Sequence, residues 1–138
     1  MISVAHVHYH LSYGLSVRRL GQIVAVDAAG GKMRWSTQGR EGENASILGG
    51  PSWLLASTTD GSLVIARANP QTYEEVRRYQ VADSAMWAYP AISGSAIIVK
   101  DEKWLHLLQL EEAAKPAVDG SSSKVSSPPM VGTPTQLP

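Results

Sequence analysis

The sequence contains no cysteine, which excludes disulfide bonds, thiolate metal sites and cysteine nucleophiles. It also lacks an excess of charge, because 12 Lys and Arg residues balance 12 Asp and Glu residues. A nucleic-acid-binding protein needs a basic surface to displace counterions from phosphates, and electrostatic docking on an anionic membrane needs one as well. The composition therefore disfavours both functions.

Long apolar runs and targeting signals are also missing. No segment approaches the ~18 consecutive apolar residues of a membrane span. The first residues carry no basic segment followed by an unbroken apolar run, so they do not resemble a signal peptide. If Met1 is the true start of the protein, the sequence predicts a cytoplasmic location. A signal peptide upstream, in a longer parent protein, would make the location periplasmic or secreted.

The sequence does contain a pattern of apolar residues with a period of two. Short apolar runs rich in β-forming residues occur at 54–56, 63–65 and 97–99, bounded by Gly, Asp and Pro. Such runs are typical of buried strands. Asp60 and Gly61 lie between two of these runs and predict a type I′ turn, in which both central residues take positive φ. Because helical segments are scarce, the pattern predicts an all-β fold.

The composition changes at about Glu111. Beyond this residue large apolar side chains almost disappear, and Ser and Pro become frequent. Such a segment cannot bury enough surface to offset its chain entropy. We therefore expect two regions, a folded repeat region at 1–110 and a disordered Ser/Pro-rich tail at 111–138.

An internal repeat divides the folded region. The segment 21–27 aligns with 61–67, which lies 40 residues later, and 103–108 follows after a further 42 residues. A period of about 40 residues with four short strands per period is the signature of a β-propeller blade. The first two copies also end alike, with an aromatic residue closing a basic strand at Trp35 and at Tyr79.

The first copy carries a compact motif, in which Gly21 opens a strand, Asp27 closes it, and Gly31-Lys32 precedes Trp35. This segment resembles the blade motif of the pyrroloquinoline-quinone (PQQ)-like repeat β-propellers, the quinoprotein alcohol dehydrogenase-like superfamily. Residues assigned to the structural blade motif are Gly21, Asp27, Gly31, Lys32, Trp35, Asp60, Gly61, Tyr79, Trp87 and Pro90.

The resemblance covers about 13–110 and departs from the motif at Arg67 and Lys103. The run from Trp87 to Pro90, followed by a strand, is similar to the last blade of such proteins. The resemblance implies a partial propeller of about two and a half four-stranded antiparallel blades with a disordered C-terminal tail. Aromatic residues are expected to lie flat between adjacent blades.

Two and a half blades cannot close a ring, because propellers have four to eight. We therefore expect the C-terminal blades of a longer propeller, or a chain that completes its ring with another chain. The expected partners are the remaining blades or another protein, with self-association through exposed blade edges as a further expectation. Neither nucleic acid nor membrane insertion is expected.

One cluster could carry metal chemistry. His6, His8 and His10 alternate along an expected strand, so all three could face one side. Three imidazoles can bind Zn²⁺, although neighbouring strands would have to complete a tetrahedral site. The alternative is a polar strand face at the chain terminus, and this interpretation predicts no metal.

No catalytic motif accompanies the repeats. The sequence has no Gly-x-Ser-x-Gly elbow, no phosphate-binding Gly-rich loop and no His-Glu-x-x-His helix. Asp27, Asp60 and Asp101 recur near expected hairpin turns, where turn chemistry accounts for them. The basic pairs 18–19 and 77–78 are expected to be solvated strand ends.

The sequence thus predicts a non-catalytic propeller module that acts as an interaction scaffold, with no catalytic residues and no cofactor. The alternative is a C-terminal fragment of a PQQ-dependent dehydrogenase. The resemblance implies that such an enzyme holds its quinone over a Trp, clamps it with Arg and Lys, and pairs it with Ca²⁺. None of these residues can be matched onto this chain, so the fragment would lack the cofactor site.

Overall fold

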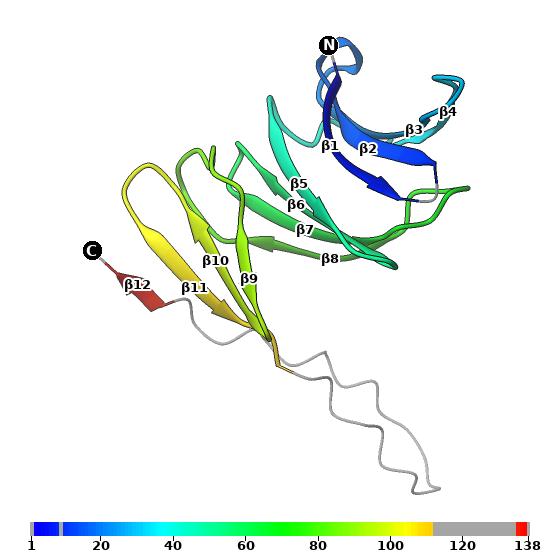
Figure 1. Cartoon of the computed structure of the whole chain (residues 1–138). Coiled ribbons are helices and arrows are strands. Elements are labelled where there is room, and N and C mark those ends of the chain that lie inside the picture. The colour runs from blue at the N-terminus through cyan, green and yellow to red at the C-terminus, as the bar shows by residue number, and fades with distance from the viewer. Residues whose placement is uncertain (1, 9, 112–134, 138) are drawn as a thin grey trace, which may run out of the picture.

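The computed structural model describes residues 2–8, 10–111 and 135–137, with side chains described at 10–18 and 20–111. Within this part of the chain the structure contains three four-stranded antiparallel sheets and no α-helix (Figure 1). A single 3-10 turn, η1 (Val17–Arg19), joins two strands. The prediction of an all-β fold is confirmed. None of the described elements is a helix able to cross a membrane.

Each sheet is named here by its place along the chain. Sheet A has the order β1 (Ile2–His8), β2 (Leu11–Ser16), β3 (Gln22–Asp27), β4 (Met33–Ser36). Sheet B has the order β5 (Ala45–Gly49), β6 (Trp53–Thr58), β7 (Ser62–Arg67), β8 (Glu75–Gln80). Sheet C has the order β9 (Ala91–Ser93), β10 (Ala96–Lys100), β11 (Leu105–Gln109), β12 (Thr135–Leu137).

Sheet B lies between sheets A and C (Figure 1). One cluster of buried residues joins sheet A to sheet B, and it includes Tyr13, Ile23 and Trp35 on the sheet A side. A second cluster joins sheet B to sheet C, and it includes Leu63 and Ile97. Both faces of sheet B are therefore covered by a neighbouring sheet.

Alternation along the strands explains this arrangement. In β2, residues Leu11, Tyr13 and Leu15 belong to the buried cluster between sheets A and B, while Ser12 and Gly14 lie at the intervening positions. Successive side chains on a strand point to opposite faces. Strand β6 is apolar at consecutive positions because both of its faces are covered.

The fourth strand of sheet C differs from what the sequence predicts. In sheets A and B the fourth strand follows the third after a short turn, but in sheet C the fourth strand is β12. It pairs with β11 through Leu105–Leu107. The tail was expected to be disordered from 111 to 138, and residues 135–137 instead form this strand. The physical reason is that the free edge of β11 presents unpaired N–H and C=O groups that accept a further strand. Residues 112–134 lie outside the described part.

Candidate functional site

Two glycines of the expected blade motif occupy equivalent corners. Gly21 precedes β3 and Gly61 precedes β7, each the third strand of its sheet, with φ of 78° and 81°. A Cβ at Gly21 would lie 1.8 Å from the carbonyl oxygen of Gly42, and at Gly61 2.1 Å from that of Ala82. At both corners the backbone that leaves the fourth strand passes so close to the glycine that no residue with a side chain fits there.

The turn at Gly61 is not the type I′ turn that the sequence predicts. Its amide donates to the carbonyl oxygen of Thr58 at 3.1 Å, so the central residues are Thr59 and Asp60. Only Gly61 has positive φ in this turn. The loop is therefore a turn followed by one left-handed residue, an arrangement that matches the strand twist as a three-residue hairpin loop.

The third corner has a different construction. Lys103, which the sequence alignment places opposite Gly21 and Gly61, lies two residues before β11 rather than directly before it, and its φ is not positive. Here Asp101 organises the turn, because its Oδ1 accepts hydrogen bonds from the backbone amides of Lys103 at 2.7 Å and Trp104 at 2.6 Å. Hydrogen bonds to the Asp101 side chain stabilise this turn, whereas the other two corners depend on a glycine with positive φ.

The second carboxylate oxygen of Asp101 binds a histidine. Oδ2 lies 3.0 Å from Nε2 of His106 on β11, and both side chains are buried, with 4% and 3% of their surface exposed. The hydrogen bond from His106, together with the amides of Trp104 and Lys103, lowers the pKa of Asp101 well below its ordinary value. The carboxylate therefore stays charged in the folded protein.

The geometry shows which ring nitrogen of His106 faces Asp101. An ionised carboxylate only accepts hydrogen bonds, so Nε2 of His106 must carry a proton toward Asp101. The other ring nitrogen is Nδ1. This atom is buried and has no hydrogen-bond partner in the described structure. Buried polar atoms without partners are uncommon, and they mark places that need an explanation.

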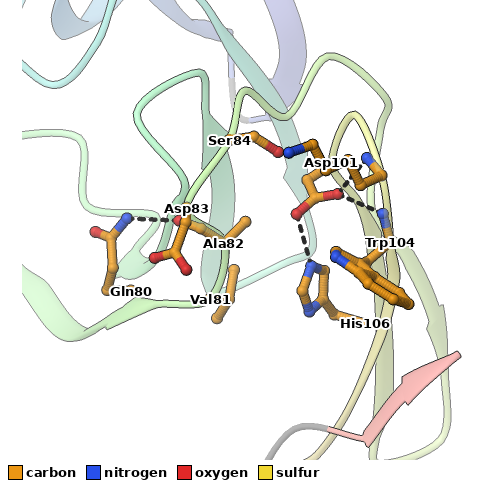
Figure 2. Close-up of a pocket in the computed structure, with 9 residues that line it drawn as sticks. Gln80, Val81, Ala82, Asp83, Ser84, Asp101, Trp104 and His106 are labelled. Atoms are coloured by element: carbon orange, nitrogen blue, oxygen red, sulfur yellow. Dashed lines mark hydrogen bonds and ion pairs between the residues drawn. The ribbon is translucent and has the colours of Figure 1, made fainter.

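A hollow of about 370 Å³ lies beside this pair. Figure 2 shows the segment 80–84 on one side of it, with Asp101, Trp104 and His106 on the other. The segment 80–84 leaves sheet B, so the hollow lies where sheets B and C meet. Exposed charges of both signs, Asp83 and Lys103, also line it.

The chemistry available in this hollow is limited. A general base must come within about 3 Å of the proton that it removes. Nε2 of His106 is occupied by Asp101, and Nδ1 is enclosed by protein without a hydroxyl or thiol partner among the described groups. The pair therefore differs from a catalytic dyad that activates a nucleophile. Its observed contacts hold the β10–β11 turn against the start of β11.

The aromatic residue of the first repeat lies between two sheets. Trp35 is buried, its ring centre is 5.8 Å from that of Tyr13 and 5.5 Å from that of Tyr73, and its Nε1 donates to the carbonyl oxygen of Asn69 at 2.7 Å. Tyr73 and Asn69 belong to the β7–β8 connection of sheet B. Tyr79 is half-buried on β8 and packs against the cluster between sheets B and C.

The other motif residues occupy turns and surface. Asp27 accepts hydrogen bonds at Oδ1 from the amides of Ala29 and Gly30, and these bonds lower its pKa. Gly31 has φ of 67°, and the exposed Lys32 accepts a backbone hydrogen bond from Asp27. Asp60 is exposed in its turn, Pro90 is buried, and Trp87 is 61% exposed.

The histidine prediction needs correction at one residue. β1 ends at His8, while His10 lies in the turn before β2 with φ of 63°. His10 is exposed and does not continue the strand, because the chain must reverse between His8 and Leu11. The side chains of His6 and His8 lie outside the described ones. Among the described residues no group of three His, Asp or Glu side chains could hold a metal ion.

Arg78 was expected to be a solvated strand end; it is exposed to solvent, but it lies within β8 and forms two ion pairs. Its guanidinium lies 2.5 Å from Glu41 Oε2 and 2.7 Å from Glu75 Oε2. Glu41 is nearly buried and belongs to the connection that leaves sheet A, so the ion pair joins sheet A to the last strand of sheet B. Charge-assisted hydrogen bonds to Glu75 and Glu41 raise the pKa of Arg78.

Sequence alone did not indicate the Asp101–His106 pair. The available signal was the alternation in β11, where His106 shares a face with the buried Leu108. A buried histidine needs a polar partner, and an antiparallel turn before β11 brings residue 101 next to residue 106.

No protein-family model matches the sequence, and no curated protein is significantly similar to it.

Proposed function

We propose that this chain is a segment of a PQQ-like repeat β-propeller and that it acts as a non-catalytic interaction module, which docks further β-sheets on its open faces. Three antiparallel sheets of four strands pack face to face, as successive blades would. The three aligned segments of the sequence each contain the start of the third strand of a sheet, with Gly21 and Gly61 directly before the strand and Lys103 two residues before it. This common position supports a repeat of one structural unit.

The observation that carries the proposal is the outer face of sheet C. Ile97, Val99 and Leu108 turn toward sheet B and are buried. The alternate residues Leu105 and Leu107 lie on the opposite face, with 38% and 39% of their surface exposed. Exposed apolar surface of this kind is typical of an interaction site.

Strand β10 extends this face. Ile98 pairs with Leu107 across the two strands, and Ala96 lies two residues before it on the same side. Both are only half-buried. The outer face of sheet C thus presents an apolar stripe over two neighbouring strands, and we call these four residues, Ala96, Ile98, Leu105 and Leu107, the outer stripe.

Sheet B shows what kind of structure covers such a face. Its own apolar residues, for example Leu55 and Leu63, are buried because a second four-stranded sheet packs on them. By the same physical argument, the outer stripe is matched in shape and polarity to another twisted sheet. The occupant that fits it is a further β-sheet of the same architecture.

A substitution on the outer stripe tests this proposal. Leu107→Arg places a charge on the open face, whereas the control Val76→Arg changes a somewhat more exposed apolar residue on β8 of sheet B. We expect Leu107→Arg to lower self-association in light scattering and binding of a hydrophobic dye, with circular dichroism and melting temperature unchanged. The control should leave association and dye binding as in the wild type. Equal effects of the two substitutions would refute an interaction role for the outer stripe.

A further inference from the structure

The fourth strand of sheet C differs in sequence from its counterparts in sheets A and B. β4 and β8 each carry an aromatic residue, Trp35 or Tyr79, that packs toward the next sheet along the chain. β12, which lies beside β11 (Figure 1), has three residues and none of them is aromatic. By its sequence, β12 therefore lacks the kind of residue that anchors the other two fourth strands.

Prolines limit how far β12 can pair. Pro134 and Pro138 flank it in the sequence, and proline has no N–H to donate to a neighbouring strand. β12 can therefore offer N–H groups from only three consecutive residues. β11 pairs with β10 along all five of its residues, 105–109, whereas its described pairing with β12 covers 105–107. The edge of β11 is thus longer than the strand that covers it.

The edge of β11 also lacks the charges found at the outer edges of the other two sheets. β8 carries Glu75, Arg77 and Arg78, and β4 carries Arg34. Charged residues on an edge strand oppose pairing with another chain. No Lys, Arg, Asp or Glu occurs in β11. Without β12, β11 would present an uncharged edge that another extended chain can join through main-chain hydrogen bonds.

The aromatic residues of β4 and β8 lie on the same face of their sheets. Trp35 is opposite Ala25 of β3, and Tyr79 is opposite Leu63 of β7. Ala25 and Leu63 each belong to the buried cluster shared with the next sheet. In both sheets the aromatic ring therefore lies on the face that turns toward that next sheet.

On β11 the corresponding face carries Leu105 and Leu107, which are exposed. The residues that β12 places opposite them are Leu137 and Thr135. Aromatic residues stabilise antiparallel pairs through contacts with the apolar side chain directly across from them. A strand with an aromatic residue at one of these two positions would therefore fit the edge of β11 better than β12 does.

We propose that the edge of β11 is a binding site for an extended segment of another polypeptide, and that β12 is a displaceable cover supplied by the chain itself. The segment that fits the site runs antiparallel to β11, has at least five residues without proline, and places an aromatic residue opposite Leu105 or Leu107. Its main-chain partners lie at the edge of sheet C, whereas the proposed function uses the outer face, so this inference does not rest on that function.

The first test is binding of a probe peptide to the full chain. The probe is a fluorescein-labelled peptide of residues 131–138 that carries Pro134→Thr, Pro138→Thr and Thr135→Trp. Fluorescence anisotropy should show about tenfold tighter binding to a chain in which Thr135→Pro and Gln136→Pro disable β12, because the fraction of open edges sets the apparent affinity. Equal affinities for this variant and the wild type would refute the cover, and binding to neither would refute the site.

Two matched peptides test the chemistry of the segment. A probe with Gln136→Pro interrupts the ladder of N–H groups and should not bind; binding equal to that of the probe would refute recognition by strand pairing. A probe that retains Thr135 should bind more weakly than the one with Trp, and equal binding would refute the preference for an aromatic residue.

A disulfide locates the binding and does not depend on the proline variant. The chain has no cysteine, so Leu105→Cys with Leu137→Cys allows one bridge within the chain, between residues that pair across β11 and β12. Directly opposed residues of antiparallel strands lie within disulfide range. The oxidised protein should not bind the probe, and reduction of the same protein should restore binding.

Two results of this experiment would overturn the proposal. Equal binding before and after reduction would place the peptide away from the edge of β11. A covalent dimer formed on oxidation, in place of a bridged monomer, would show that β12 covers β11 of a second copy, so that the cover is exchanged between chains.

Discussion

The two interfaces within the chain are built differently. Between sheets A and B, aromatic rings pack at tilted angles, Trp35 donates a hydrogen bond to the carbonyl oxygen of Asn69, and Arg78 pairs with Glu41. Between sheets B and C the buried residues are mostly aliphatic, with Met86 filling space beside Ser57.

Both interfaces contain hollows, and the one between sheets A and B, of about 420 Å³, lies beside Trp35 and Tyr73. The space beside Asp101 and His106 lies at one end of the contact between sheets B and C, and an apolar pocket of about 270 Å³ that includes Trp53 and Ile92 also joins those two sheets. The hydrogen bond from Trp35 and the ion pair of Arg78 make the contact between sheets A and B the more specific of the two. The buried Asp101–His106 pair lies at the edge of the contact between sheets B and C.

The largest expected effect is at the centre of the contact between sheets A and B. Trp35→Ala removes a buried ring and leaves the carbonyl oxygen of Asn69 without its donor, so we expect a loss of about 3–5 kcal/mol in the free energy of unfolding. Urea denaturation measures it. Trp87→Ala, at a ring that is 61% exposed, is the control and should cost less than about 1 kcal/mol. Equal losses would contradict the assignment of Trp35 as the central contact.

A smaller loss is expected at the glycine corner of sheet B. In Gly61→Ala the new methyl would lie 2.1 Å from the carbonyl oxygen of Ala82, at a φ of 81°. The left-handed conformation alone costs about 1–2 kcal/mol for a residue with a side chain, and the close contact adds to this. Gly94→Ala has open space at a φ of 58° and tests the conformational cost alone. Thermal melting should show the larger decrease for Gly61→Ala.

The Asp101–His106 pair predicts that the free energy of unfolding depends on pH in the acid range. The pKa of Asp101 is lowered from its ordinary value of 3.8, so the unfolded chain takes up a proton at a higher pH than the folded chain does. The stability due to this charge is therefore fully present above about pH 4 and is lost as the pH falls toward the folded-state pKa. We expect Asp101→Asn to be less stable at pH 7 and to lose less stability between pH 4 and pH 2.

Urea midpoints measured across this pH range check the expectation. His106→Gln is the matched variant, because its amide can still donate to Asp101 Oδ2 and should preserve part of the acid dependence. If the wild type and Asp101→Asn lose the same stability between pH 4 and pH 2, the Asp101 carboxylate does not contribute to the acid dependence.

The smallest effect is expected for the ion pair that joins sheet A to β8. A double-mutant cycle on Glu41 and Arg78 should give a coupling of about 1 kcal/mol or less, because Arg78 is partly exposed and exposed pairs are worth little. The control cycle is Arg67 with Glu74, a pair at 2.8 Å within one hairpin and more exposed. Its coupling should be smaller still. A larger coupling in the control would show that the link between sheets adds no stability of its own.

Local patterns in the sequence predicted most of the strands. The apolar runs at 54–56, 63–65 and 97–99 lie in β6, β7 and β10. Tyr79, which was predicted to close a basic strand, lies on β8. These predictions succeed because alternation and β propensity act over a few neighbouring residues.

Contacts between distant residues were not predictable in the same way. Arg78 and Glu41 are 37 residues apart, so no local pattern indicates that they meet. His10 looked like one more strand residue, although the turn takes it out of the strand. β12 follows a long segment in which strand-forming residues are scarce. Its three residues pair with the free edge of β11, which no local pattern could indicate.

The sequence by itself determined an all-β chain with corners at Gly21 and Gly61, because positive φ and period-two alternation are properties of single residues and their neighbours. Only the tertiary structure decided that Asp101 meets His106, that Trp35 reaches Asn69, and which faces of the sheets stay open. The physical reason is that burial and pairing depend on which sheet covers which face, and that is a property of the packed arrangement rather than of any short segment.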